Sequence, residues 1–450
     1  MSSTDDGSED RPRGRLRPAG ASGAFIVAGE VIVRGDDALA RLQQIAAEQG
    51  ADRELDPDLD GQWFRVVGVP DALAAVEQLR GEGYTAQPNH GFGAHSSTAT
   101  CTGGGCACCC DPCGPHPSAQ FMANPFMAHP FMAHPFMAHP FMAHPFMAHP
   151  FMAHPFMAHT RAHNTAIPAD PPKHQVATMS WPKDPAVVIF DTGLAEGQQR
   201  PAVLPATVTG DPDQPDVGYV ESDGTFVPAD DYIDPVAGHG TFIAGLVERL
   251  APGATITVED VLSPAGLLDE WGLKNRLTAL AATEPAPDFL SLSLGGPAVV
   301  PPAYLHQGLL VVRKHGVVIV ASAGNAATCE PFYPAAFPEV IAVGALGPDG
   351  PAPFTNYGPW VDASAPGVDL TSTYFKALPK GLLSPVPGID ASAFDGWARW
   401  SGTSFSVPVV IGALLREMAL GGLDAHKAVE RLLRAEHTLR IPDLGAVVNL

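Results

Sequence analysis

Four polar residues of the sequence have the types and the order that hydrolysis by an activated serine requires. Asp191 follows an apolar run, His239 begins a helical pattern, Asn325 follows another apolar run, and Ser404 begins a later helical pattern. A serine hydroxyl is a weak nucleophile until a base takes its proton, which neutral histidine can do near pH 7. A buried carboxylate orients the imidazole, while the backbone N–H of Ser404 and the amide of Asn325 can stabilise an oxyanion. Each residue alone is typical of a cap or a turn, so only the combination predicts catalysis.

Alternating strand-like and helical segments surround these residues and predict how they come together. Strands are expected at 186–190, 255–261, 289–294, 317–322 and 340–345, and helices at 239–250, 267–282, 302–315, 404–418 and 424–435. Continuously apolar strands indicate a parallel sheet covered by helices on both faces. Because open sheets of this kind bind ligands beyond the carboxyl ends of their strands, the four residues are expected at that edge.

The motifs around the four residues resemble the signatures of the subtilisin-like serine proteases, peptidase family S8. They are Asp191-Thr-Gly, Gly-His239-Gly-Thr, Ala-Gly-Asn325 and Gly-Thr-Ser404-Phe, with a proline four residues after the serine, and the resemblance covers about residues 184–450. It implies a doubly wound α/β fold with a mainly parallel sheet, and a serine endopeptidase that works through an acyl-enzyme. It also implies Asp191 as orienting acid, His239 as general base, Ser404 as nucleophile and Asn325 as oxyanion donor. Aspartic proteases share Asp-Thr-Gly, but they need a second such loop, and this sequence contains no other.

The resemblance further implies how a peptide substrate would be bound. An extended substrate would pair, by β-addition, with the backbone of Ser293, Leu294 and Gly295. The other wall of the first specificity pocket would be Ser322, Ala323 and Gly324. Phe332 is expected either at the base of this pocket or as an ordinary core residue, and nearby Cys329 as a small buried residue.

No cofactor is expected for the chemistry itself. The Asp-rich segment 211–234 is compatible with a structural Ca²⁺ site, but it lacks the 12-residue pattern of a calcium loop. A solvated loop is the alternative.

Residues 24–90 show a strand–helix–strand–helix–strand pattern of the size of a small α+β domain. They resemble the inhibitory propeptide of the same protease family, which implies a ferredoxin-like fold that binds its own protease domain. The tail at 86–92, or the residues just after it, would then enter the cleft, with self-cleavage between about Asn89 and Thr100. Residues 1–23 are expected to be disordered.

A linker of unusual composition, residues 91–183, separates the two predicted domains. Eight Phe-Met-Ala motifs recur at five-residue steps from Phe121 to Phe156, most followed by His-Pro, which excludes regular helix and central strand. A Cys-rich segment precedes them and suits thiolate binding of Zn²⁺ or Cu⁺, although its spacing matches no closed zinc motif. A plain linker and an anchor for a membrane or partner remain alternatives. The candidate ligands are Cys101, Cys106, Cys108, Cys109, Cys110 and Cys113.

The composition limits the classes of partner. A formal net charge of -22 argues against a nucleic-acid or anionic-membrane partner, because both need a basic face. No run of about 18 apolar residues predicts a transmembrane segment, and no clear signal peptide is seen, so a cytoplasmic location is the default, with unconventional export open. Peptide or protein substrates and the propeptide-like domain are the expected partners. Two functions compete with a general endopeptidase: an inactive scaffold on a protease fold, and a processing factor dedicated to one peptide.

Overall fold

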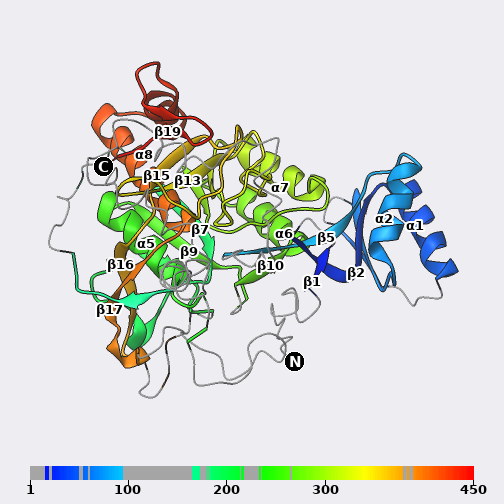
Figure 1. The fold of residues 1–450 in the computed structure, drawn as a ribbon, viewed down its shortest axis with the longest axis horizontal. Coiled ribbons are helices and arrows are strands. Elements are labelled where there is room, and N and C mark those ends of the chain that lie inside the picture. The colour runs from blue at the N-terminus through cyan, green and yellow to red at the C-terminus, as the bar shows by residue number, and fades with distance from the viewer. Residues whose placement is uncertain are drawn as a thin grey trace, which may run out of the picture.

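The computed structural model describes two folded parts of the chain that lie against each other (Figure 1). It describes residues 16–94 and 165–449, except 20–22, 50–53, 59–60, 173–178, 180, 182, 213, 217–232, 235, 264–265, 379–381, 383 and 385–388. The proposed Cys ligands and the Phe-Met-Ala repeat lie outside the described residues. Everything below concerns the described residues alone.

A ten-stranded sheet forms the centre of the larger part. Its strand order is β18-β19-β15-β13-β12-β11-β7-β9-β8, with β14 paired to β13, and all neighbours are parallel except β13/β14 and β18/β19. This confirms the predicted α/β fold with a mainly parallel sheet. The strands are β7 (Ala186–Asp191), β8 (Val208–Gly210), β9 (Thr255–Asp260), β11 (Phe289–Leu292), β12 (Val318–Ser322), β13 (Ile341–Gly347), β14 (Gly350–Pro351), β15 (Ala363–Pro366), β18 (Arg440–Ile441) and β19 (Gly445–Val447).

Helices cover both faces of this sheet because its strands are apolar on both sides. In β7, Val187 and Ile189 face the helices α5 and α8, whereas Val188 and Phe190 face α6 and α7. The same alternation in β11 and β12 produces two continuous cores, one on each side of the sheet. The helices are α5 (His239–Leu250), α6 (Glu270–Ala281), α7 (Ala303–Lys314), α8 (Thr403–Gly421) and α9 (Ala425–Val429), which a π-helical turn (Glu430–Arg434) extends.

Helix α8 passes straight through the core and is the one described helix long and apolar enough to span a membrane. Of its most apolar window, 72% is buried inside the protein, as expected for a core helix that packs against α5 and the sheet. A small separate sheet, β16-β17-β6, packs beside α5 and consists of Leu370–Lys376, Asp395–Trp400 and Ile167–Pro168. Its strand β6 and the last three residues of β5 (Ala86–Gly93) lie within the predicted linker 91–183, which therefore contains some regular structure.

The smaller part has the strands and helices expected of residues 24–90, with one further strand, β3, between the first helix and the next predicted strand. Its sheet runs β5-β2-β4-β3, and helices α1 and α2 share one hydrophobic core with it. The elements are β1 (Leu16–Ala19), β2 (Ala24–Arg34), α1 (Asp36–Glu48), β3 (Glu54–Pro57), β4 (Trp63–Val67), α2 (Ala72–Gly81) and β5 (Ala86–Gly93). The prediction of disorder at 1–23 is wrong for β1, which is held by antiparallel pairing with β2.

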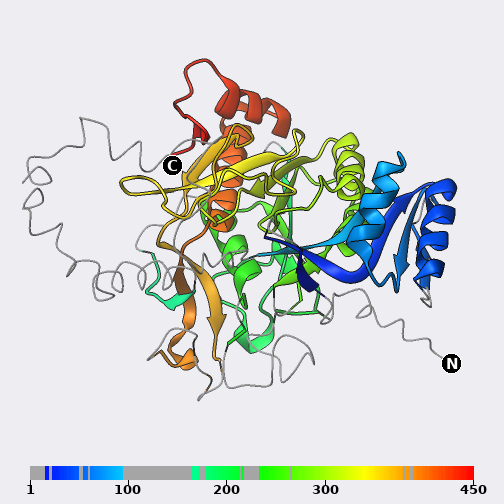
Figure 2. The same cartoon turned by 45° about the vertical axis from the view of Figure 1, so that its right-hand side comes forward.

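Strand β5 leaves this domain and enters the larger one, as the cyan strand in Figures 1 and 2 shows. It pairs antiparallel with β10 (Leu267–Asp269), so a single sheet crosses from one part to the other. The predicted helix 267–282 is thus wrong in its first turn. Asp269 caps α6 by accepting a hydrogen bond from Gly272 N (2.7 Å), and the residues before this cap are free to pair with β5.

Candidate active site

Asp191 and His239 form a buried pair at the carboxyl edge of the sheet. Asp191 ends β7 and His239 begins α5, and neither side chain has any exposed surface. Nδ1 of His239 lies 2.8 and 2.9 Å from the two carboxylate oxygens of Asp191. A carboxylate that accepts the Nδ1 proton leaves Nε2 as the nitrogen that can take a proton from a nucleophile.

Two glycines beside His239 let α5 start this close to the turn after β7. Gly238 has φ 78°, a left-handed conformation that favours glycine. A Cβ on Gly240 would overlap the carbonyl oxygen of Gly193. The small residues of the Gly-His-Gly-Thr motif are therefore required by the approach of α5 to β7.

Ser404 lies in the first turn of α8, where backbone N–H groups lack partners within the helix. Its side chain is buried, and its hydroxyl oxygen is 3.3 Å from the carbonyl oxygen of Ser293 and 3.5 Å from that of Ala94. The ring of the next residue, Phe405, lies 5.2 Å from the His239 imidazole, measured between ring centroids. The N-termini of α5 and α8 thus bring the predicted base and nucleophile to the same place.

Asn325, the predicted oxyanion donor, is anchored by its carbonyl end. Its Oδ1 accepts hydrogen bonds from both the backbone N–H and the hydroxyl of Thr403, each 2.9 Å long. The Nδ2 end is thereby turned toward Gly402, on the Ser404 side of the loop. Asn356, which sequence reasoning missed, holds the loop that carries Asn325. It accepts a hydrogen bond from Ala326 N (2.9 Å) and donates one to the Ala323 carbonyl (2.8 Å).

The end of β5 lies beside Ser404. Gly93 and Gly295 exchange two backbone hydrogen bonds of 3.0 Å, and Ala94 N donates to the Gly266 carbonyl at 3.0 Å. The segment is thus held between the predicted substrate-binding strand on one side and β10 on the other. Phe92 is 1% exposed and packs in the apolar core beneath α6, with Leu268 and Leu294 as neighbours.

The remaining predicted pocket residues lie near this segment. Ser293 donates its hydroxyl to the Ser404 carbonyl (2.8 Å), and Ser322 ends β12 just before Ala323 and Gly324. Phe332 is buried, and a Cβ on either Gly295 or Gly324 would contact its ring. The ring therefore occupies the space between the two predicted walls. Cys329 is half-buried and disulfide-bonded, so the prediction of a simple small buried residue is wrong.

The Asp-rich segment is only partly described, and Asp216 within it is buried rather than solvated. Its Oδ2 accepts hydrogen bonds from the Thr192 hydroxyl (2.7 Å) and from Gly238 N (2.8 Å). Burial raises the pKa of this carboxyl well above its usual value, as do the nearby Asp260 and Asp191 carboxylates, while its two hydrogen bonds lower it. Among the described residues, no group of three or more His, Cys, Asp or Glu side chains could hold a metal ion.

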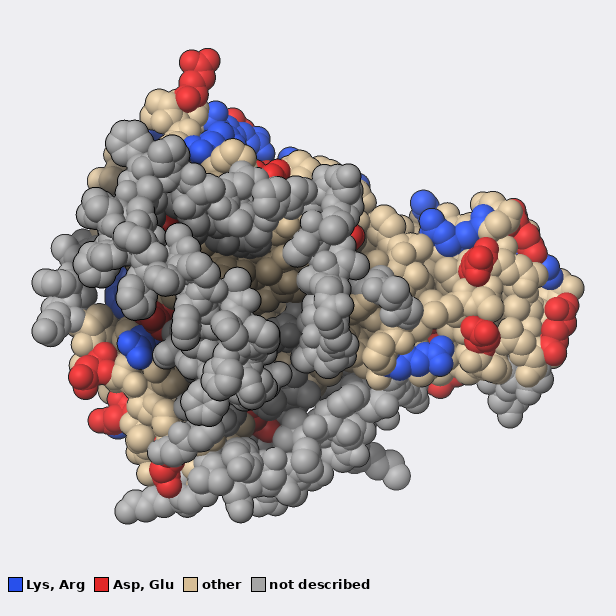
Figure 3. All heavy atoms as spheres, in the orientation of Figure 1, with Lys and Arg blue, Asp and Glu red and all other residues tan. Residues whose placement is uncertain are grey.

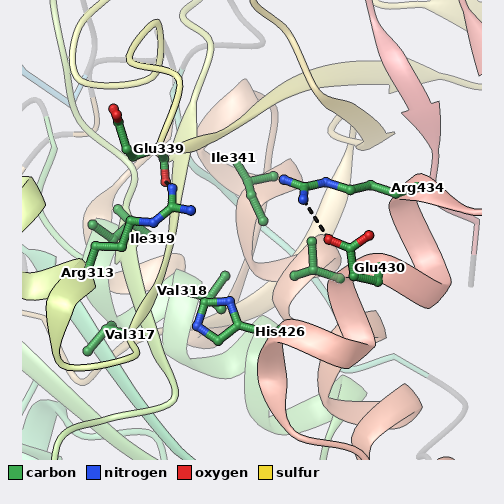
Figure 4. Close-up of a pocket in the computed structure, with 10 residues that line it drawn as sticks. Arg313, Val317, Val318, Ile319, Glu339, Ile341, His426, Glu430 and Arg434 are labelled. Carbon is green, nitrogen blue, oxygen red and sulfur yellow. Dashed lines mark hydrogen bonds and ion pairs between the residues drawn. The ribbon is translucent and has the colours of Figure 1, made fainter.

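A crevice of about 50 Å³ lies at the opposite end of the sheet, at the amino ends of β12 and β13 (Figure 4). Arg434 pairs with Glu430 at 2.6 Å, and Arg313 donates to the Glu339 carbonyl at 3.3 Å. The lining contains two arginines and two glutamates, so the formal charges of these four side chains sum to zero. On the face shown in Figure 3, the described acidic and basic side chains are likewise interspersed.

Comparison with known proteins agrees with this fold. The model of the subtilase family matches residues 182–436, more than half of the chain. Subtilisin Savinase of Lederbergia lenta is 31% identical over 246 residues, which are 51% of this chain and 79% of that protein. An alkaline protease of Alkalihalobacillus alcalophilus is also 31% identical, over 51% of this chain and 56% of its own length, and thermitase of Thermoactinomyces vulgaris is 31% identical over 47% and 73%. These similarities support a serine-type endopeptidase, and the family match shows that this chain belongs to the subtilases.

Proposed function

We propose that this chain is a serine endopeptidase in which Ser404 attacks the substrate carbonyl and His239 takes the hydroxyl proton. The observation that carries the proposal is the buried Asp191–His239 pair, whose imidazole lies 5.2 Å from the ring of Phe405, the residue after Ser404. The end of β5 already pairs there with the backbone of Gly295. Asp191 holds the imidazole in the tautomer that exposes Nε2 to the nucleophile and stabilises the imidazolium that forms. The Ser404 backbone N–H, at the positive end of α8, and Asn325 Nδ2 are the donors for the oxyanion.

The reaction then proceeds in two balanced steps. His239 returns its proton to the leaving amine as the peptide bond breaks, which leaves an acyl-enzyme on Ser404. A water molecule, deprotonated by His239, attacks the ester and releases the new carboxylate, and the proton returns to Ser404. The two steps consume one water molecule, and His239 is the proton acceptor and donor in both.

We further propose that the N-terminal domain inhibits the protease by capping two of its helices. Gln87 Oε1 accepts hydrogen bonds from Ala303 N (2.9 Å) and Tyr304 N (3.3 Å) at the start of α7. Asn89 Oδ1 accepts one from Trp271 N (3.2 Å) at the start of α6. Helix starts carry backbone N–H groups that need such acceptors, so the two amide side chains dock the domain where the protease offers free donors.

An aromatic and ionic cluster surrounds these caps. The Tyr304 ring stacks on Trp271 (4.7 Å between centroids) and meets Trp63 of the N-terminal domain edge-on (5.3 Å). Lys274 of α6 lies 3.3 Å from Asp58 of the N-terminal domain, with both side chains almost completely buried. Buried aromatic and charged residues of this kind carry most of the binding energy in protein interfaces, which supports a tightly bound inhibitor.

We infer that the chain cleaves itself at the His95–Ser96 bond. Gly93 and Gly295 form a hydrogen-bonded antiparallel pair. A peptide that continued in this register would form its next pair of the same kind between position 95 and Ser293. The Ser404 hydroxyl lies 3.3 Å from the Ser293 carbonyl and 3.5 Å from the Ala94 carbonyl, so the chain passes the proposed nucleophile at the end of β5. The proposal names one bond, just beyond Ala94, within the expected range of Asn89 to Thr100.

Mass spectrometry and active-site labelling of the full chain test these proposals. Wild type, once self-processed and diluted so that the N-terminal domain dissociates, should react with a fluorophosphonate probe, and its fragments should end at His95 and begin at Ser96. Ser404→Ala should remain unlabelled and intact, because the nucleophile is gone. Ser392→Ala, at an exposed serine in a short turn remote from the triad, should behave as wild type. Absence of labelling in wild type would contradict the peptidase, and identical fragments from wild type and Ser404→Ala would contradict self-cleavage.

A further inference from the structure

Asp216 lies behind the catalytic pair and takes no part in the steps above. It is 6% exposed, and its Oδ2 joins two residues that are direct neighbours of the pair. The Thr192 hydroxyl, next to Asp191, donates to it at 2.7 Å, and the N–H of Gly238, next to His239, donates at 2.8 Å. One carboxylate oxygen therefore bridges the two turns that carry the acid and the base.

A second link reinforces this bridge. The Thr192 hydroxyl oxygen also accepts a hydrogen bond from Gly240 N at 3.1 Å. The backbone N–H groups on both sides of His239 are thus bound by Asp216 and Thr192. Asp216 is itself anchored, because its own N–H donates to the Leu194 carbonyl at 3.1 Å.

We propose that Asp216 is a positioning residue of the catalytic centre, which holds the turn after Asp191 and the start of α5 at a constant separation. The inference rests on the proposed peptidase function and adds a residue to it. The separation matters because the bond from Nδ1 to the Asp191 carboxylate orients the imidazole, and a misplacement of about 1 Å at a reacting centre costs roughly 100-fold in rate.

The bridge depends on an oxygen acceptor and not on a negative charge. Since burial shifts the pKa of Asp216 upward, the carboxyl can be neutral and still accept both hydrogen bonds through Oδ2. Asparagine has the same shape and offers one carbonyl oxygen at that position. Alanine offers none and leaves the Gly238 N–H and the Thr192 hydroxyl without this acceptor.

Steady-state hydrolysis of a peptide by Asp216→Ala and Asp216→Asn, each prepared as the full chain, tests the inference. Fluorophosphonate labelling first counts the active sites, so kcat refers to folded enzyme alone. Asp216→Ala should lower kcat about 10- to 100-fold with KM within about threefold of wild type, because it disturbs the catalytic pair and not the cleft. Asp216→Asn should restore kcat to within about threefold of wild type.

Each other result overturns the inference. Wild-type kcat in Asp216→Ala would show that the bridge has no role. An equal loss in both variants would show that the acceptor is not what matters, and a loss explained by fewer active sites would show a purely structural role. A failure of the peptidase proposal is distinguishable, because wild type and Ser404→Ala would then have equal activity.

Discussion

At the scale of single residues, the proposed catalytic groups are hydrogen-bonded to partners that have further hydrogen bonds of their own. Thr403 is the clearest case, because it lies directly before the nucleophile and serves the oxyanion donor as well. Its hydroxyl donates to Asn325 Oδ1 and accepts from Gly324 N at 3.2 Å. The same side chain thus orients the amide of Asn325 and holds the backbone of Gly324, the residue before it.

Thr403→Val tests this orientation with a side chain of the same shape. The valine cannot bond Asn325 or Gly324, so the amide is less restrained and a buried N–H loses its acceptor, at a cost of about 1–3 kcal/mol in stability. We expect kcat to fall about tenfold, corresponding to about 1.4 kcal/mol of transition-state stabilisation. Thr403→Ser keeps the hydroxyl and should retain activity. Equal kcat values for the valine and serine variants, measured per labelled active site, would refute the role.

At the scale of elements, the site depends on how closely helices approach the sheet edge. Helix α5 contacts the turn after β7 through Gly240. At the N-terminus of α8, Ser404 forms two hydrogen bonds with Ser293, the residue after β11: the Ser293 hydroxyl donates to the Ser404 carbonyl, and the Ser404 hydroxyl donates to the Ser293 carbonyl. Helix α5 could not approach as closely with a larger residue in place of Gly240. The triad geometry is therefore a property of packing between elements as much as of the three side chains.

Gly240→Ala makes this dependence measurable. The added methyl group would overlap the Gly193 carbonyl oxygen and push the start of α5 away from Asp191. We expect kcat to fall by about 100-fold or more. The control is Gly81→Ala in α2, where an added Cβ meets nothing within 4 Å and should raise stability by about 0.5–1 kcal/mol. Kinetics and thermal unfolding of both variants give the comparison, and an active Gly240→Ala enzyme would contradict the packing argument.

Most helices and strands of the larger part were predictable from the sequence, and the exceptions have a common cause. The bounds of α5 follow from its own glycine-rich start and apolar pattern, and the structure confirms them. The strand at 267–269 was predicted as helix, because Leu267 and Leu268 continue a helical pattern and the pairing that decides their state comes from residues 91–93. The bridge through Asp216 was missed for the same reason, since its partners are separated from it by more than twenty residues. Contacts made across the chain leave no local signal.

At the scale of the whole molecule, the two parts share one sheet and one interface, as Figure 2 shows for β5 and the helices it meets. The acceptors of Gln87 and Asn89 and the strand in the cleft lie on one continuous segment. Binding of the domain and occupation of the active site are therefore the same event. Inhibition should weaken when any part of this segment binds less well.

Gln87→Ala should show this in the self-processed protein. It removes the acceptor for two N–H groups of α7, a loss of about 1–3 kcal/mol that corresponds to roughly 5- to 150-fold weaker inhibition. The measurement is the peptidase rate over a dilution series. Because the Gln87→Ala domain dissociates more readily, activity should appear at a higher protein concentration in this variant than in wild type. Gln44→Ala changes a glutamine on the exposed side of α1 and should match wild type. Identical dilution curves for all three proteins would contradict docking by the caps.

The Lys274–Asp58 pair has a consequence for which inhibitors the protease can accept. Lys274 is 2% exposed, lies 3.3 Å from Asp58 and faces the Tyr304 ring at 4.9 Å, so the bound domain removes its charge from water. A related domain without an acid at that place would bury the ammonium unpaired, a penalty of about 3–5 kcal/mol. If the N-terminal domain acts as the proposed inhibitor, Lys274 therefore favours a domain with an acid at this place over a domain without one.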